Sequence, residues 1–280
     1  MKNTKVVTLE EAISAIPDGA VVALSGNTLH RSPGAAVHEI IRQGKQGLEL
    51  VKTAGAYDVD VLCGAGCVAA VSAGFVGFEN VFGLAPRYRK AVESGAVEVR
   101  EHACYSVIAG LRAAIQGVPF MPVRGMTGSD VLAARDFRTV TDPYSGESVV
   151  AIPRLQPDVA IIHVQEATVN GDARIFGSRF EDVLMAKASQ HVIITCEQLV
   201  DPGLLEQQPE LTTIAGFFVD AVVEIPGGAW PNSCYGYYDY DHDFLEAYIR
   251  AAQADDPIYE MFLRENILNR APAGVEAGVL

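Results

Sequence analysis

The stretch that decides the fold class of this 280-residue chain is Ala-Val-Val-Ala-Leu-Ser-Gly-Asn-Thr, residues 20–28. Its five apolar residues predict a strand buried on both faces, and the polar, glycine-bearing run that follows predicts a loop at the carboxyl end of that strand. Pro33 then begins a predicted helix that runs to about Gln43, and residues 48–52 are a second short apolar strand. A strand, a glycine-bearing loop, a helix and another strand are the repeating unit of a parallel sheet.

The same alternation recurs along the chain. Further strands are predicted at residues 97–100, 118–123, 159–164, 191–196 and 221–225, and further helices at residues 6–16, 105–116 and 181–189. Because these strands are continuous apolar runs, we expect a mainly parallel, open α/β sheet with helices on both faces. Residues 127–148 have little periodicity and contain a turn signal at residues 142–146, so we expect them to leave the sheet.

The end of the chain has a different composition. A Pro-Gly-Gly turn at residues 226–228 and a tyrosine-rich loop at residues 235–240 precede two predicted helices, at about residues 243–254 and 258–269. We therefore expect an α/β domain over residues 1–225. Residues 226–280 are expected to form a loop and helical extension that packs on this domain or on a partner.

Composition excludes several classes of function. The net charge is -14, which disfavours binding to nucleic acid phosphates and to anionic membrane surfaces. No apolar run reaches the roughly 18 residues that a membrane-spanning helix needs, and the first residues lack the apolar core of a signal peptide. The chain has five cysteines, and an odd, scattered set is a poor disulfide framework. We therefore expect a cytoplasmic protein.

Several motifs lack the context that their chemistry needs. Residues 64–69 match G-x-G-x-x-A formally, but no convincing buried strand precedes them and no suitably spaced acidic residue follows, which argues against dinucleotide binding. Cys63 and Cys67 have no second ligand pair for zinc, and residues 239–243 lack the spacing of a calcium loop. We expect no metal site, and the absence of G-x-S-x-G gives no support to a serine hydrolase.

Two loops are candidates for ligand binding. Gly26, Asn27 and Thr28 follow the first strand, at the edge where open α/β sheets place their ligands. Gly128 and Ser129 lie in a second such loop, after the apolar residues 118–123. Either loop could bind a ligand, or could serve only the capping of the following helix.

The motifs along the chain, taken in order, resemble the A subunits of the glutaconate CoA-transferases, within the class I CoA-transferase family. The likeness spans nearly the whole chain, including the carboxyl-terminal extension, and as a set it is specific. The matching stretches are residues 26–43, 87–90, 117–122 with 128–129, 159–163, 180–183, 195–197, 219–223 and 226–241.

The resemblance implies a fold, a reaction and a partner. In such enzymes a glutamate carboxylate attacks an acyl-CoA, an anhydride forms, and a glutamyl-CoA thioester follows, from which a second carboxylic acid collects the CoA. That glutamate belongs to the B subunit, so no nucleophile is expected in this chain. The resemblance also implies a heterodimer, assembled to a heterotetramer or larger, with a CoA thioester and a carboxylic acid as substrates and no tightly bound cofactor.

Two positions depart from the family pattern. Cys104 stands where the transferases carry glutamine and where a related steroid ring-opening CoA hydrolase carries glutamate, and a related methylglutaconyl-CoA decarboxylase shares the two-subunit architecture. The alternative is therefore a decarboxylase or hydrolase that acts on a CoA thioester. Cys104 faces the active site either as a thiolate at a helix N-terminus near His102 or, as we favour, as a small residue of the pocket wall.

Trp230 stands where the closest family pattern has histidine, and it either reshapes the substrate pocket or repacks a loop. Phe75 is a further candidate for the pocket. Phe75, Phe78 and Trp230 would make that pocket apolar, although any of them could equally belong to the core. The role expected for the pocket residues is to position a carboxylate or thioester oxygen with backbone and side-chain donors.

Overall fold

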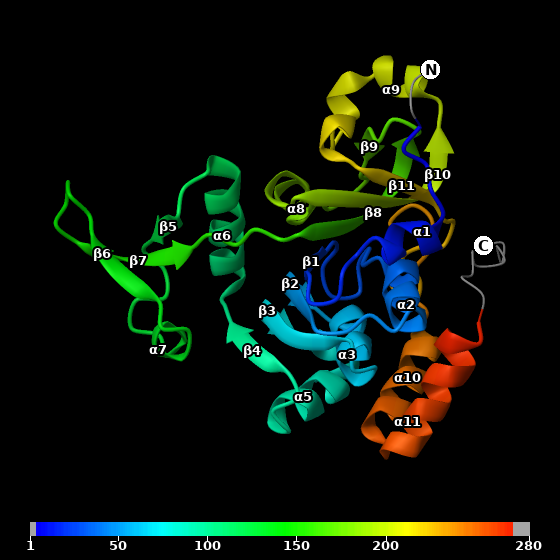
Figure 1. Ribbon diagram of the computed structural model, residues 1–280, viewed down its shortest axis with the longest axis horizontal. Coiled ribbons are helices and arrows are strands. Elements are labelled where there is room, and N and C mark those ends of the chain that lie inside the picture. The colour runs from blue at the N-terminus through cyan, green and yellow to red at the C-terminus, as the bar shows by residue number, and fades with distance from the viewer. Residues whose placement is uncertain (1–3, 271–280) are drawn as a thin grey trace.

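The computed structural model describes residues 4–270, and its centre is a twisted parallel sheet (Figure 1). The strand order is β11-β10-β8-β1-β2-β3-β4, and the short β9 pairs with β8 in the antiparallel sense. The strands are β1 (Val21–Leu24), β2 (Leu48–Gly55), β3 (Val68–Val76), β4 (Glu98–Glu101), β8 (Val159–Thr168), β9 (Ala173–Arg174), β10 (His191–Val200) and β11 (Ala221–Glu224). The expected α/β class with a mainly parallel sheet is confirmed.

Helices cover both faces of this sheet, as the apolar strands require. Val22 and Leu24 of β1 face one layer, formed by α1 (Leu9–Ser14), α2 (Gly34–Arg42) and α3 (Tyr57–Gly64). Ala23, between them, faces the other layer, formed by α6 (Cys104–Gln116) and α8 (Asp182–Ala188). Successive side chains of a strand point to opposite faces, so one short strand contributes to both cores.

A small antiparallel sheet projects from the main body, at the left of Figure 1. It has the order β5-β7-β6, with β5 (Phe120–Val123), β6 (Arg138–Thr141) and β7 (Ser148–Pro153), and it carries α7 (Val131–Ala134). The prediction that residues 127–148 leave the main sheet is confirmed. The expectation that residues 118–123 alternate with helices in the parallel sheet is wrong. Pro122 has no N–H to donate, and β5 lies at the edge of the small sheet, where a proline is tolerated.

Two elements beside the candidate site were not predicted from the sequence. Residues 57–64 form α3, and β3 fills the place between β2 and β4. β3 is built mostly of small residues, and a Cβ atom at its Gly74 would lie 2.3 Å from the backbone nitrogen of Cys104. β3 contains three valines, but small residues separate them, and the glycine among these is required where α6 approaches the strand backbone.

The glycines of the G-x-G-x-x-A match lie at the end of α3 and in the turn that follows it. Gly64 is the last residue of α3, and Gly66 forms the turn into β3. A dinucleotide fingerprint runs from a strand into a helix, the reverse of this order. The arrangement therefore gives the motif no phosphate-binding helix N-terminus.

The carboxyl-terminal extension packs on the same chain. It comprises α10 (His242–Gln253), α11 (Asp256–Leu263) and the π-helical turn Arg264–Leu268, and its buried Tyr248 and Tyr259 join the core that contains α2 and α3. The division into two units at residue 225 stays a prediction. Within residues 4–270, no helix is long and apolar enough to span a membrane.

The buried carboxylate of Asp60 joins α3 to the extension. It accepts hydrogen bonds from the Tyr88 backbone N–H and from the Tyr248 hydroxyl, both at 2.7 Å. Tyr88 belongs to α5 (Pro86–Glu93), so one carboxylate holds three helices together. Burial raises the pKa of Asp60 to about 6.

We expect Asp60 to make the free energy of unfolding fall as the pH rises from about 4 to about 6. A carboxyl whose pKa is raised on folding contributes its full stability below its unfolded pKa, and that stability is lost as the pH rises through the folded pKa. The rise in the pKa of Asp60 corresponds to a change of about 3 kcal/mol in the free energy of unfolding. Asp60→Asn keeps a hydrogen-bond acceptor without a charge, so urea unfolding between pH 4 and 8 should show a flatter profile.

The exposed Asp130 provides the control, because its side chain accepts no hydrogen bond from residues 4–270. Asp130→Asn should reproduce the profile of the unmodified protein. A profile for Asp60→Asn that runs parallel to that of the unmodified protein would contradict the assignment.

Candidate active site

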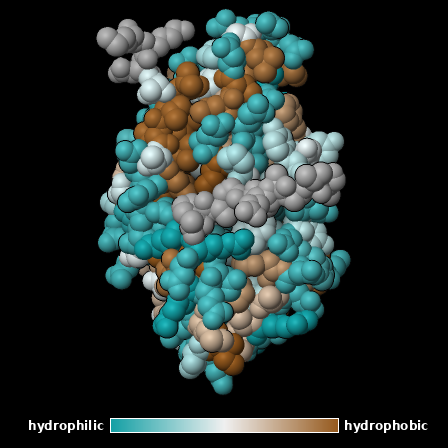
Figure 2. Space-filling view, turned by 90° about the vertical axis from the view of Figure 1, so that its right-hand side faces the viewer, coloured by the Kyte–Doolittle hydropathy of each residue, from teal (hydrophilic) through white to brown (hydrophobic). Residues whose placement is uncertain are grey.

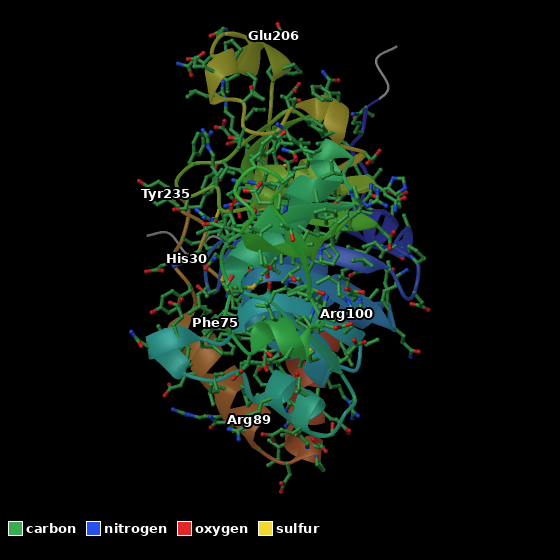
Figure 3. The ribbon with its side chains drawn as sticks, turned by 90° about the vertical axis from the view of Figure 1, so that its left-hand side faces the viewer. His30, Phe75, Arg89, Arg100, Glu206 and Tyr235 are labelled. Carbon is green, nitrogen blue, oxygen red and sulfur yellow. The ribbon has the colours of Figure 1, made fainter. Side chains whose placement is uncertain are left out.

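The carboxyl ends of β1, β2 and β3 meet the amino-terminal ends of α6 and α8, and this junction contains most of the predicted site residues. Thr53 of β2 bonds to residues at the starts of both helices. Its hydroxyl donates to Glu181 Oε2 at 2.6 Å, and its carbonyl oxygen accepts from Cys104 Sγ at 3.4 Å. Figure 3 shows His30, Phe75 and Tyr235 along one flank of the molecule.

The conformation of Gly26 requires glycine. Its φ is 77°, and a Cβ atom there would lie 2.3 Å from the carbonyl oxygen of His30. Its N–H donates to Asp182 Oδ1 at 3.1 Å. Gly26 therefore holds the loop against α8 and has no free donor for a ligand.

The two residues after Gly26 also use their backbone donors within the protein. The Asn27 N–H donates to His30 at 2.9 Å, and the Thr28 N–H donates to Ala54 at 3.0 Å. The backbone N–H groups of this loop are therefore already bonded within the protein. That Gly26, Asn27 and Thr28 line the substrate pocket stays a prediction. Thr28 is buried and Asn27 is half-buried, so Asn27 offers the more accessible side chain.

The buried ammonium group of Lys52 fixes the shape of the chain at the carboxyl edge of the sheet. Lys52 Nζ donates to the Ser25 carbonyl oxygen and the Ser32 hydroxyl, both at 2.7 Å, and to the carboxylate of Asp58. An ammonium group has three donors, so all are satisfied. Lys52 and Asp58 are both fully buried, and the ion pair is structural.

A second buried ion pair lies beside the first. The Arg31 guanidinium bonds the carboxylate of Asp182, and it also donates to the carbonyl oxygens of His163, at 2.6 Å, and Ser178, at 3.1 Å. Burial raises the pKa of Asp182, against the opposing effect of Arg31. Arg31 is thus committed to protein acceptors and does not reach a substrate.

Cys104 is the first residue of α6, and its side chain is exposed at the junction. Partial burial and the nearby negative charge of Glu181 raise the pKa of its thiol. A helix N-terminus usually lowers the pKa of a thiol, but here burial, with a smaller effect of Glu181, raises the pKa of Cys104. The raised pKa favours a neutral thiol at this exposed position.

His102 does not act as a base for Cys104. Its Nδ1 is paired with the Ser106 hydroxyl at 2.8 Å, and its ring lies 5.5 Å from the ring of Phe137 in the projecting sheet. Burial, with a smaller effect of Arg135, lowers the pKa of His102 to about 4. The imidazole is therefore neutral, and it packs where the projecting sheet meets the main body.

Glu181 is the residue of the junction that the sequence did not single out. It precedes α8, is half-buried, and accepts the hydrogen bond from Thr53. Its place in an acidic pair with Asp182 at the start of a predicted helix was the available signal. That pattern is also ordinary helix-capping chemistry, so the sequence could not distinguish the two.

The remaining predicted residues are divided between this junction and other places. Phe75, near the end of β3, is 41% exposed and stays a candidate for the pocket wall, whereas Phe78 is buried in the core. Gly128 and Ser129 lie in the projecting sheet, between β5 and α7, away from the end of β1 (Figure 1). The Ser129 hydroxyl accepts from the Val131 N–H at 3.2 Å, which is a capping contact.

Trp230 repacks a loop. Its indole Nε1 donates to Asp241 at 2.9 Å, and its ring centroid lies 4.3 Å from that of Phe244 and 5.9 Å from that of His38. These contacts join the extension to α2. The structure therefore supports the packing alternative for this position.

His163, Glu197 and Cys234 place possible metal-ligand atoms within 4.8 Å of one another. The His163 ring nitrogens already pair with Glu197 at 2.8 Å and with Thr195 at 2.9 Å, and the other Glu197 oxygen accepts from the Gly227 N–H at 2.7 Å. These bonds occupy both ring nitrogens of His163, so its imidazole has no free lone pair for a metal. We interpret the cluster as an anchor for the carboxyl-terminal loop.

An apolar groove of about 550 Å³ lies at the opposite edge of the sheet, where α1 meets the starts of β8, β10 and β11. Figure 2 shows apolar residues gathered on this face. The groove is lined by Val7, Ala12, Ile16, Val159 and Ile193, among others. It faces away from Cys104 and is separate from the candidate site.

Comparisons with known proteins agree on one family. The family profile described as Coenzyme A transferase matches residues 6–225. Over 280 residues the chain is 36% identical to the A subunit of glutaconate CoA-transferase from Acidaminococcus fermentans, covering 94% of this chain and 87% of that protein. It is 35% identical to the A subunit of 3-oxoadipate CoA-transferase from Pseudomonas knackmussii, covering 87% of each.

Solved structures extend the likeness to the fold. The crystal structure of the Acidaminococcus fermentans glutaconate enzyme superposes with a TM-score of 0.89, covering 95% of this chain and 90% of that one. A crystal structure of the decarboxylase AibA/AibB superposes with a TM-score of 0.86 at 34% identity, covering 96% of this chain and 100% of that one.

We expect Cys104→Ala to retain at least partial activity in the assembled enzyme, because a neutral pocket-lining thiol is replaced by another small side chain. In the native protein Cys104 should also react slowly with iodoacetamide at pH 7. The labelling rate should rise with pH, and the midpoint of that rise should lie above the ordinary thiol pKa of about 8.5. Mass spectrometry can assign the label, since the other four cysteines are buried.

Cys104→Ala serves as the labelling control and should leave the native protein unlabelled. Complete inactivation of a properly folded Cys104→Ala variant would overturn this interpretation, as would rapid labelling of Cys104 at pH 7.

Proposed function

The chain belongs to the coenzyme A transferase family, and from this premise we propose that it is the A subunit of a heteromeric enzyme that moves CoA between carboxylic acids. The observation that carries the proposal is the extent of the likeness. Two transferase A subunits are 35–36% identical to the chain over most of its length. The glutaconate enzyme also matches in fold over 95% of the chain, which includes the extension.

In this proposal the covalent step takes place on a glutamate of the B subunit. The carboxylate attacks the thioester carbonyl and releases the CoA thiolate, leaving a mixed anhydride. The thiolate then attacks the glutamyl carbonyl, which releases the first acid and leaves a glutamyl-CoA thioester. A second carboxylate reverses both steps and leaves with the CoA, so one difficult transfer becomes several easier ones.

The chemistry of the junction supports a partner-borne nucleophile. Lys52 and Arg31 are bonded to acids of the same chain, and the raised pKa of Cys104 disfavours a thiolate. What the chain offers to a ligand is a wall formed by Cys104 and Phe75, with the buried Thr53 behind it. A B subunit would have to supply the attacking carboxylate opposite this wall.

The partner follows from the same relatives. The two curated transferases are named as A subunits, which supports a B subunit for this chain. We propose a heterodimer, assembled to a heterotetramer or larger, with a CoA thioester and a carboxylic acid as substrates. No tightly bound cofactor enters the proposed chemistry.

A decarboxylase or hydrolase that acts on a CoA thioester is the second candidate. The likeness to AibA/AibB, at 34% identity over 96% of the chain, favours it. Cys104, at the centre of the junction, is the position at which such a change of reaction would be expected. The two candidates differ in whether a carboxylic acid acceptor is needed for turnover.

We expect thioester consumption to require an added carboxylic acid when the chain is co-expressed with a B subunit of the same enzyme. Incubation with acyl-CoA followed by hydroxylamine should convert one B-subunit glutamate into its hydroxamate, with loss of activity, because hydroxylamine attacks the glutamyl thioester. Mass spectrometry of both subunits gives the position of the modification.

The same enzyme without acyl-CoA is the control and should keep its activity in hydroxylamine. Turnover without any acceptor acid would contradict the transferase function. Release of carbon dioxide in that experiment would support the decarboxylase, and release of free acid and CoA would support the hydrolase.

A further inference from the structure

We propose that the apolar groove beside α1 is the surface by which one A–B heterodimer binds the B subunit of a second heterodimer. The inference rests on the proposed function, because it assigns a contact within the assembly that this function requires. The groove lies at the edge of the sheet opposite Cys104, and its residues are assigned no part in the chemistry.

The groove has a volume of about 550 Å³ and a largely apolar lining. Ile16 after α1, Val159 at the start of β8 and Ile193 of β10 form its floor, and each is no more than 5% exposed. Ala15 and Pro17 are exposed beside this floor, on the face where Figure 2 shows apolar residues gathered. Aliphatic side chains of a partner would lose their contact with water against this lining.

Three carboxylates also line the groove, those of Glu11, Asp158 and Asp220. Each accepts a hydrogen bond from a backbone N–H at 2.8 or 2.9 Å, which fixes its position. Within residues 4–270, no lysine or arginine forms an ion pair with any of the three. The exposed His191 lies 3.8 Å from Asp220. An acidic rim therefore borders the apolar floor.

Two lysines close to the groove do not reverse this charge. Lys5 and Lys45 each donate to a backbone carbonyl oxygen at 2.6 Å, and neither lines the groove. Glu10 and Asp18, which are exposed, are sequence neighbours of lining residues and add two further acids. The charge that a partner meets at the groove is therefore negative.

An apolar floor with an acidic rim fits a partner segment whose aliphatic side chains are flanked by lysine or arginine. A second copy of this chain lacks that complementarity, because a symmetric contact would bring two acidic rims together. The net charge of -14 adds to this repulsion between copies. An anionic membrane surface would be repelled in the same way.

The B subunit of a second heterodimer is the component that remains. The proposed function places one B subunit at the carboxyl edge of the sheet, opposite Cys104. The groove lies at the starts of β8, β10 and β11, so it is turned away from that subunit. A neighbouring heterodimer offers an A subunit, which like charge disfavours, and a B subunit, which we expect to carry the basic, apolar segment.

Ala15→Trp fills the groove and tests the contact through the mass of the assembled enzyme. Ala15 is exposed at the end of α1, so a larger side chain there leaves the core unchanged. By analytical ultracentrifugation at micromolar concentration, we expect the unmodified enzyme to be a heterotetramer or larger. The Ala15→Trp enzyme should be a heterodimer that retains its rate of CoA transfer.

Ala96→Trp is the matched control for this change. Ala96 is exposed before β4, at the other side of the sheet from β11. This substitution adds the same side chain away from the groove, and the enzyme should keep the mass of the unmodified assembly.

A second variant tests the charge of the rim. Glu11→Gln combined with Asp220→Asn removes two negative charges and keeps the oxygens that accept from the backbone. We expect the dissociation constant of the assembly into heterodimers to rise about tenfold. Asp243→Asn combined with Glu260→Gln removes the same number of charges from exposed positions on α10 and α11, and should leave that constant unchanged.

Carbodiimide cross-linking identifies the occupant, because the reagent joins a carboxylate to a lysine amine as an amide where the two groups touch. Mass spectrometry of the digested enzyme should find Glu11 or Asp220 joined to a lysine of a B subunit. Their attachment to a lysine of a second copy of this chain would overturn the inference.

Three results from ultracentrifugation would also overturn it. These are an unmodified enzyme that is only a heterodimer, an Ala15→Trp enzyme that keeps the full mass, and an Ala15→Trp enzyme that separates into free A and B subunits. The last result would place the B subunit of the same heterodimer in the groove. A heterotetramer that depends on the groove but transfers no CoA would contradict the proposed function and support this inference.

Discussion

A single buried ammonium group, that of Lys52, joins three segments at the carboxyl edge of the sheet. It bonds the Ser25 carbonyl at the end of β1, the Ser32 hydroxyl before α2, and the Asp58 carboxylate in the first turn of α3. A buried charge is costly unless every donor is satisfied. The chain is therefore constrained to bring these segments together in one arrangement, and the loop after β1 takes its shape from that arrangement.

The second buried pair extends this constraint to α8 and determines what the site can do. Asp182 binds Arg31 and the Gly26 N–H, so the loop after β1 is held from both sides. Strong donors and acceptors are thus used to build the edge and are not available to a substrate. The exposed wall that results has a neutral thiol at Cys104 and a carboxylate at Glu181, which explains why such a chain would depend on a partner for covalent chemistry.

The sequence predicted the parallel sheet because its strands are continuous apolar runs, and it placed the loop at residues 26–28 correctly at the end of the first strand. It did not reveal β3, in which small residues separate the three valines and Gly74 is required by the close approach of α6. Resemblance to a family pointed to Cys104, but no feature of the sequence around Glu181 identified that residue. Its importance depends on Thr53, which is 128 residues away in the chain.

The central claim is that this chain forms one wall of the site and that its partner carries the nucleophile. The most direct measurement is a crystal structure of the assembled A and B subunits in which the covalent thioester has been trapped. The account predicts CoA in thioester linkage to a B-subunit glutamate, with the reacting carbonyl facing Cys104 and Glu181. A covalent bond to any residue of this chain, or CoA bound away from the carboxyl edge of its sheet, would contradict it.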